Sequence, residues 1–75
     1  MNRIRRNEVK EVCVKLKEIR DELYDIQNDE QDAYDSIPEN LQDSEKAEQS
    51  GEAIDAMEEA LDNIDEAIET LQELL

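Results

Sequence analysis

Apolar residues recur along this chain in alternating steps of mostly three and four, and this spacing constrains the fold more than any other feature. In the first half they are Val9, Val12, Leu16, Ile19, Leu23, Ile26, Ala33 and Ile37. In the second half they are Ala47, Ile54, Met57, Leu61, Ile64, Ile68, Leu71 and Leu75. This alternation is the a/d seam of a coiled coil, and no two-residue alternation typical of a β-strand competes with it. The sequence therefore predicts an all-α fold with two long amphipathic helices.

A single proline, Pro38, separates the two apolar patterns. Proline disfavours the helical conformation at the residue before it, so the first helix is expected over about residues 4–35. A turn should follow over about 36–43, and a second helix over about 44–74. The chain is then one domain, a helical hairpin over residues 1–75.

Polar residues in the turn have the spacing of helix-capping motifs. Ser36 and Glu39, three residues apart, have the form of a capping box beside a short helical turn near 38–42. Asp43 or Ser44 can accept a hydrogen bond from the first free amide groups of the second helix. The local sequence thus favours a turn at the place where the first apolar pattern stops.

The distribution of charge favours an antiparallel arrangement of the helices. The 75 residues include 23 Asp and Glu against 8 Lys and Arg, a formal net charge of −15. Residues 1–20 hold seven bases and three acids, net +4, and residues 60–75 hold five acids and no base, net −5. A hairpin lays these two oppositely charged stretches side by side, whereas a parallel arrangement would bring the acidic parts together.

With the loop centred near Asn40, the two seams can be placed in register. The expected facing pairs are Val9–Leu71, Val12–Ile68, Leu16–Ile64, Ile19–Leu61, Leu23–Met57, Ile26–Ile54 and Ala33–Ala47. Glu30 and Ser50, which interrupt the two seams, then fall opposite each other. In this register Tyr34 can pack over Gly51, which would explain why a glycine stands inside the second helix. A local irregularity of the helix at this position is the alternative explanation. A register displaced by about two residues pairs most of the same residues and stays open.

A single hairpin of this size buries only one narrow seam and is expected to be marginally stable. The second helix has a further row of small or apolar residues at seven-residue spacing: Ala53, Ala60, Ala67 and Leu74. Three residues flank the first seam and would widen its buried face: Cys13, Val14 and Tyr34. Small residues let a neighbouring helix approach closely, although alanine is also simply the best helix former. We expect the alanine row to form a homodimer interface, giving a four-helix bundle.

The residue types that most catalytic and metal sites require are missing. There is no His, and the single Cys13 cannot form an internal disulfide or a thiolate zinc site. Gly51 is the only glycine, so there is no glycine-rich phosphate loop. Residues 29–35 lack the glycine and the closing glutamate of an EF-hand calcium loop. An enzyme is not expected, and no catalytic residue, cofactor or metal ligand is predicted.

The distribution of apolar residues gives no sign of a membrane segment. The longest apolar run is Val12-Cys13-Val14, far too short to span a bilayer. The basic start of the chain is not followed by an apolar stretch, so a signal peptide is not expected. We expect a cytoplasmic protein without a membrane partner.

The turn also carries a resemblance. Residues 32–45, D-A-Y-D-S-I-P-E-N-L-Q-D-S-E, resemble a signature of short acidic helical proteins of unknown function from Gram-positive bacteria and their phages or mobile elements. In those proteins an I-P-E-N-L-Q-x-S-E turn precedes a helix rich in Ala, Glu and Asp, similar to this chain from Ala47 onward. The resemblance covers about residues 16–75. It implies a helical hairpin and an accessory role in a phage or bacterium, and it implies no activity.

Most of the negative charge lies near the turn. Residues 21–59 hold 15 acids and one base, which accounts for −14 of the net −15. The candidate contacts for a basic partner surface are Asp25, Asp29, Asp32, Asp35, Glu39, Asp43, Glu45 and Glu48. Solubility alone is the other explanation of this charge. The favoured function is a protein–protein interaction module of unknown specific role.

Two further functions are alternatives to this module. The first alternative is an acidic mimic of nucleic acid that inhibits a DNA-binding protein, since duplex DNA carries one charge per ~1.7 Å of axis. The second is direct binding of nucleic acid or a membrane surface through the basic cluster at residues 2–6. It is disfavoured because the net charge of −15 repels polyanions.

Overall fold

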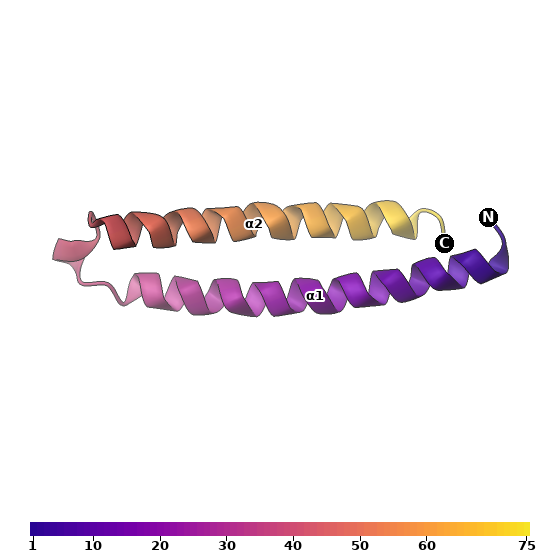
Figure 1. The fold of residues 1–75 in the computed structure, drawn as a ribbon, viewed down its shortest axis with the longest axis horizontal. Coiled ribbons are helices and arrows are strands. Elements are labelled where there is room, and N and C mark those ends of the chain that lie inside the picture. Colours follow the sequence, from indigo (N-terminus) through magenta and orange to yellow (C-terminus); the bar gives the residue numbers. More distant parts are fainter.

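Two long helices and one short helical turn make up the whole structure. A computed structural model describes all of residues 1–75. The elements are α1, Arg3–Asp35, a short 3₁₀ helix η1, Glu39–Leu41, and α2, Glu45–Gln72. The helices lie side by side and run in opposite directions, with both termini at the same end of the rod (Figure 1). The prediction of an all-α helical hairpin is confirmed.

Side-chain caps mark the start of both long helices. The Asn2 side chain accepts a hydrogen bond from the amide of Arg5, with an N–O distance of 2.8 Å. The Ser44 hydroxyl accepts one from the amide of Ala47 at 3.2 Å. Of the two residues expected to cap the second helix, Ser44 is therefore the one that does so. Each cap satisfies an amide that has no partner within its helix.

The capping box expected from Ser36 and Glu39 does not form. Ser36 is the C-cap residue of α1, and its hydroxyl donates a hydrogen bond to the carbonyl oxygen of Asp32 at 2.8 Å. The 3₁₀ helix begins after Pro38 without a side-chain cap. The physical reason is the proximity of the free carbonyls at the end of α1, which offer the hydroxyl an acceptor one helical turn back.

α2 presents its predicted row to α1. The buried or half-buried members of that row are Ala47, Ile54, Met57, Leu61, Ile64, Ile68 and Leu71. α1 and the residues just after it present a different set from the one predicted: Val9, Cys13, Leu16, Arg20, Leu23, Gln27, Glu30 and Tyr34 on the helix, and Ile37 in the turn. Val9, Leu16, Leu23 and Ile37 belong to both the predicted and the observed sets. At the four remaining apolar positions of the predicted seam, the residue that follows in the sequence faces α2 instead.

The predicted pairs that used Val12, Ile19, Ile26 and Ala33 are therefore wrong. These four side chains are exposed, and α1 is rotated about its axis so that the residue after each of them faces α2. Those following residues make specific contacts with α2: Arg20 and Gln27 form hydrogen bonds to it, and Tyr34 packs against it. Hydrogen bonds and aromatic packing thus replace the apolar pairs that the spacing alone predicts.

Near the turn the expected register is confirmed at two places. The Ser50 hydroxyl donates to the Glu30 carboxylate with an O–O distance of 2.7 Å, so the two polar interruptions do lie opposite each other. The ring of Tyr34 lies over Gly51, with its Cε2 atom 3.8 Å from the position that a Cβ atom would take. The glycine therefore leaves room beneath the ring for one methyl group.

The core of the single hairpin is thin. Only five of the 75 residues are buried: Cys13, Gln27, Ala47, Leu61 and Ile68. No large side chain is completely enclosed. The rod is 59 Å long but only 15 Å by 12 Å across, so nearly every side chain reaches the surface.

Replacing Gly51 by Ala should stabilise the protein. The added methyl would sit at ordinary van der Waals distance from Tyr34, and alanine in a helix is favoured over glycine by about 1 kcal/mol. We expect the melting temperature in thermal circular dichroism to rise by roughly 4–8 °C. Gly51→Leu is the matched control, because its longer side chain must displace the ring and should lose the gain. A Gly51→Ala variant no more stable than the wild type would show that the position needs glycine for another reason.

Candidate functional site

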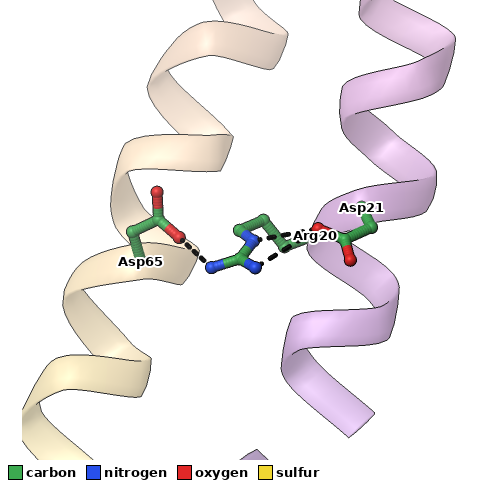
Figure 2. A network of polar contacts seen from close by, with 3 residues as sticks. All are labelled: Arg20, Asp21 and Asp65. Atoms are coloured by element: carbon green, nitrogen blue, oxygen red, sulfur yellow. Dashed lines mark hydrogen bonds and ion pairs between the residues drawn. The ribbon is translucent and has the colours of Figure 1, made fainter. Parts of the chain in front are cut away.

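Arg20 links the two helices near the middle of the rod. Its Nη1 atom donates to the Asp65 carboxylate on α2 at 3.1 Å, while Nε and Nη2 donate to Asp21 on α1 at 3.3 and 3.2 Å (Figure 2). Figure 2 shows the guanidinium group reaching from α1 between the two carboxylates. The hydrogen bond to Asp65, followed by the one to Asp21, raises the pKa of Arg20 above its ordinary value. The guanidinium group stays charged, and its ion pair places Arg20 of α1 at the same height along the rod as Asp65 of α2.

Gln27 is the one buried polar residue, with 7% of its surface exposed. Its side-chain nitrogen donates to the Ile54 carbonyl oxygen at 3.3 Å and to the Glu58 carboxylate at 2.7 Å. No buried side-chain nitrogen or oxygen lacks a hydrogen-bond partner. Together with Arg20 and Glu30, Gln27 makes a polar seam between the helices. Sequence reasoning missed Arg20 and Gln27, although with Cys13 and Tyr34 they recur every seven residues.

The eight acidic residues proposed as a partner surface are all exposed at the loop half of the rod: Asp25, Asp29, Asp32, Asp35, Glu39, Asp43, Glu45 and Glu48. None of them is ion-paired, since both ion pairs of the structure involve Arg20. Their side-chain hydrogen bonds come from neutral amides, from Gln31 to Asp35 and from Gln49 to Glu45. Their negative charges are therefore not compensated within the chain.

The structure brings these carboxylates to one end of the molecule but not to one face. Asp25 and Asp32, seven residues apart, lie on the side of α1 that points away from α2. Asp29 and Asp35 lie on either flank of that row, and the other four belong to the turn and the start of α2. We call this set of eight residues the acidic end. It surrounds the loop and offers no concave pocket.

Exposed apolar residues form a row along each helix. In the row proposed as a dimer interface, Ala60 is half-buried and Ala53, Ala67 and Leu74 are exposed. The second row, on α1, consists of the residues displaced from the predicted seam. Val12 is 46% exposed, Ile19 50% and Ile26 56%. These are large side chains for a surface, and together with the first row they form what we call the apolar face.

Both rows lie on the same side of the hairpin. Residues seven apart share a side of a helix in a coiled coil, so Ala33 continues the row of Ile26 and Lys46 begins the row of Ala53. Ala33 and Lys46 line one shallow groove between the helices. Tyr24, Glu58 and Asp65 line another, which lies on the opposite side. The two rows of the apolar face therefore lie on one side of the hairpin, and the polar groove beside Arg20 lies on the opposite side.

No group of three or more metal-ligating side chains converges in the structure. Neither helix contains a stretch that is long and apolar enough to cross a membrane. A comparison with protein families, curated proteins and solved structures finds no match for this chain. The acidic end and the apolar face are the two distinctive surface features of the molecule.

Gln27→Leu should increase stability. The change removes a side-chain amide from the buried seam. The exposed Glu58 carboxylate can then bind water instead, and the Ile54 carbonyl oxygen still accepts the backbone hydrogen bond of its helix. Replacing buried polar contacts by apolar ones of similar size is often neutral or favourable, so we expect a gain of about 1 kcal/mol in urea unfolding. Gln27→Ala, which leaves a void, should lose stability. If Gln27→Leu also lost it, the two hydrogen bonds would contribute more than their desolvation costs.

Proposed function

We propose that this protein is a non-enzymatic protein–protein interaction module that acts as a homodimer and binds a basic partner surface through its acidic end. The observation that supports it is the set of eight exposed carboxylates, none of which has a cationic partner in the chain. Uncompensated charge of one sign attracts a complementary surface and accelerates docking. The resemblance of the turn to acidic proteins of phages and mobile elements supports an accessory role in such an element.

Docking by the end of the rod fits the charge better than mimicry of nucleic acid. A mimic needs closely spaced negative charges along its length. Here the first 20 residues carry a net charge of +4, so the net negative charge of α1 is confined to its second half. The mimic remains the alternative function. A partner whose DNA binding is abolished by the protein would favour it.

Charge reversal at the acidic end should weaken partner binding. The partner is first identified by affinity capture from the native host and mass spectrometry. The variant then carries Asp29→Lys, Asp32→Lys, Glu45→Lys and Glu48→Lys, and we expect its affinity to fall at least tenfold and its salt dependence to flatten, because these charges draw the partner in. Binding and its salt dependence can be followed by surface plasmon resonance.

The matched control reverses four acids in the half of α2 away from the loop: Asp62, Glu66, Glu69 and Glu73, all exposed. It has the same net charge as the first variant, so a purely global charge effect would weaken binding equally in both. Unchanged affinity in the first variant would leave solubility as the role of the acidic end.

The homodimer can be tested separately, without a partner. Ala60→Glu places a charge in the middle of the alanine row, and burying it between two copies would be strongly unfavourable. We expect sedimentation equilibrium to give a mass of twice 8.7 kDa for the wild type and a monomer for the variant at the same concentration. Gln72→Glu adds the same charge at an exposed position outside the row and should stay dimeric. A wild-type monomer at high micromolar concentration would refute the dimer.

A further inference from the structure

The apolar face differs from the rest of the surface in its lack of charge. Residues 45–75 include eleven acids, and none of them lies in the row from Ala53 to Leu74. The neighbouring outward row is also uncharged: Gln49, Ala56, Asn63 and Thr70. Along the other sides of α2 almost every position that does not face α1 is acidic. In a chain of charge −15, a row without charge stands out, and depletion of charged residues is typical of the core of a protein–protein interface.

The two rows of the apolar face have their midpoints at the same level. The three large residues of the row on α1, Val12, Ile19 and Ile26, are centred on Ile19, the residue before Arg20. The row on α2 runs from Ala53 to Ala67 and is continued by Leu74 in the turn just after the helix; it is centred at Asn63–Ile64, next to Asp65. The ion pair between Arg20 and Asp65 fixes these two levels side by side. One two-fold axis through this level therefore exchanges the levels of Val12 and Ile26 on α1, and those of Ala53 and Leu74 and of Ala60 and Ala67 in the α2 row.

Charge selects the direction in which a second copy would lie. Residues 1–20 carry a net charge of +4, whereas residues 21–35 hold seven acids and no base. If the copies run antiparallel, the basic half of one α1 lies on the acidic half of the other. The opposite arrangement, with both loops at one end, would place the two −14 segments, residues 21–59 of each copy, against each other.

We propose that the apolar face binds a second copy of this chain in the antiparallel direction, with α1 packed on α1 and α2 on α2 about a two-fold axis near Ile19. The inference rests on the proposed homodimer and adds its orientation, its register and the contribution of α1. Val12 of one copy then lies beside Ile26 of the other, and Ile19 lies beside Ile19. On α2, Ala60 meets Ala67 and Ala53 meets Leu74. The small residues let the two α2 helices approach closely, while the larger residues fill the space between the α1 helices.

The size of the hairpin is compatible with such an assembly. The hairpin is 59 Å long and 15 Å wide, so the whole side that carries the apolar face covers on the order of 900 Å². A stable interface of standard size needs about 800 Å² from each partner. The dimer would also give α1 a buried face that includes Val12, Ile19 and Ile26, as wide as is usual for helices in bundles.

Single cysteines test the axis directly. Cys13 is replaced by Ala so that each variant carries one thiol. Ile19→Cys should then form an intermolecular disulfide under mild oxidation, because a residue on the axis lies beside itself and disulfides need Cβ atoms about 3.8 Å apart. Glu18→Cys is the control at the same level but on the outward side of α1, and it should stay largely reduced. The products are separated on non-reducing gels.

Mixed variants test the register. Val12→Cys and Ile26→Cys should each crosslink poorly alone, since the two levels are about 21 Å apart along the helix. A mixture of the two, one of them carrying a tag that shifts its mass, should give the heterodimeric band. Ala60→Cys mixed with Ala67→Cys checks the same axis on α2, so the result does not depend on the folding of one variant.

Three outcomes would overturn the proposal, and each is distinguishable. A disulfide between Ile19→Cys and Asn63→Cys, with none between two Ile19→Cys chains, would show the loops at one end and leave the dimer itself intact. A dimer by sedimentation in which no variant of the apolar face crosslinks would show that another surface mediates it. A monomeric wild type would refute the dimer altogether, while leaving the acidic end and its partner to be tested independently.

Discussion

The orientation of α1 about its own long axis, which determines the side chains that face α2, is the constraint on which the other features of this structure depend. It is maintained by a few contacts with α2: the ion pair from Arg20 to Asp65, the hydrogen bonds of Gln27, and the ring of Tyr34 over Gly51. An exposed ion pair contributes little stability, and the core it accompanies is thin. These contacts matter chiefly because they select one side of α1 over its neighbour. Polar groups placed in an apolar seam commonly specify register in this way.

The same rotation determines the chemistry of the surface. Since Arg20 and Gln27 face α2, the apolar side chains one position earlier must face solvent or another molecule. They meet the alanine row on one side of the hairpin, while the carboxylates of α2 occupy its remaining sides. The molecule thus has the apolar face on one side, a polar groove on the opposite side and an acidic end around the loop. Any partner encounters these regions separately.

The fold followed from the sequence because the heptad pattern and Pro38 act locally. The helix limits, the Ser44 cap and the facing pair of Glu30 and Ser50 all depend on spacing along the chain. The side of α1 that faces α2 could not be predicted from the sequence. After Leu16, either the residue three positions later, Ile19, or the residue four positions later, Arg20, can face α2 in a helix. Apolarity favours Ile19 at that step, and only the position of Asp65 across the helices favours Arg20. That choice depends on contacts far apart in the sequence, which periodicity cannot supply.

The length of the rod has a consequence for how the protein could act. The acidic end lies at one extremity of a hairpin 59 Å long, and an antiparallel pair would carry one such end at each extremity. Such a dimer is bivalent: it could hold two basic partners apart at a fixed spacing, or engage two sites on one larger assembly. In the second case the linkage raises the effective concentration for the second contact, so weak individual docking would give durable attachment. A stiff helical spacer would then be as important as either charged end.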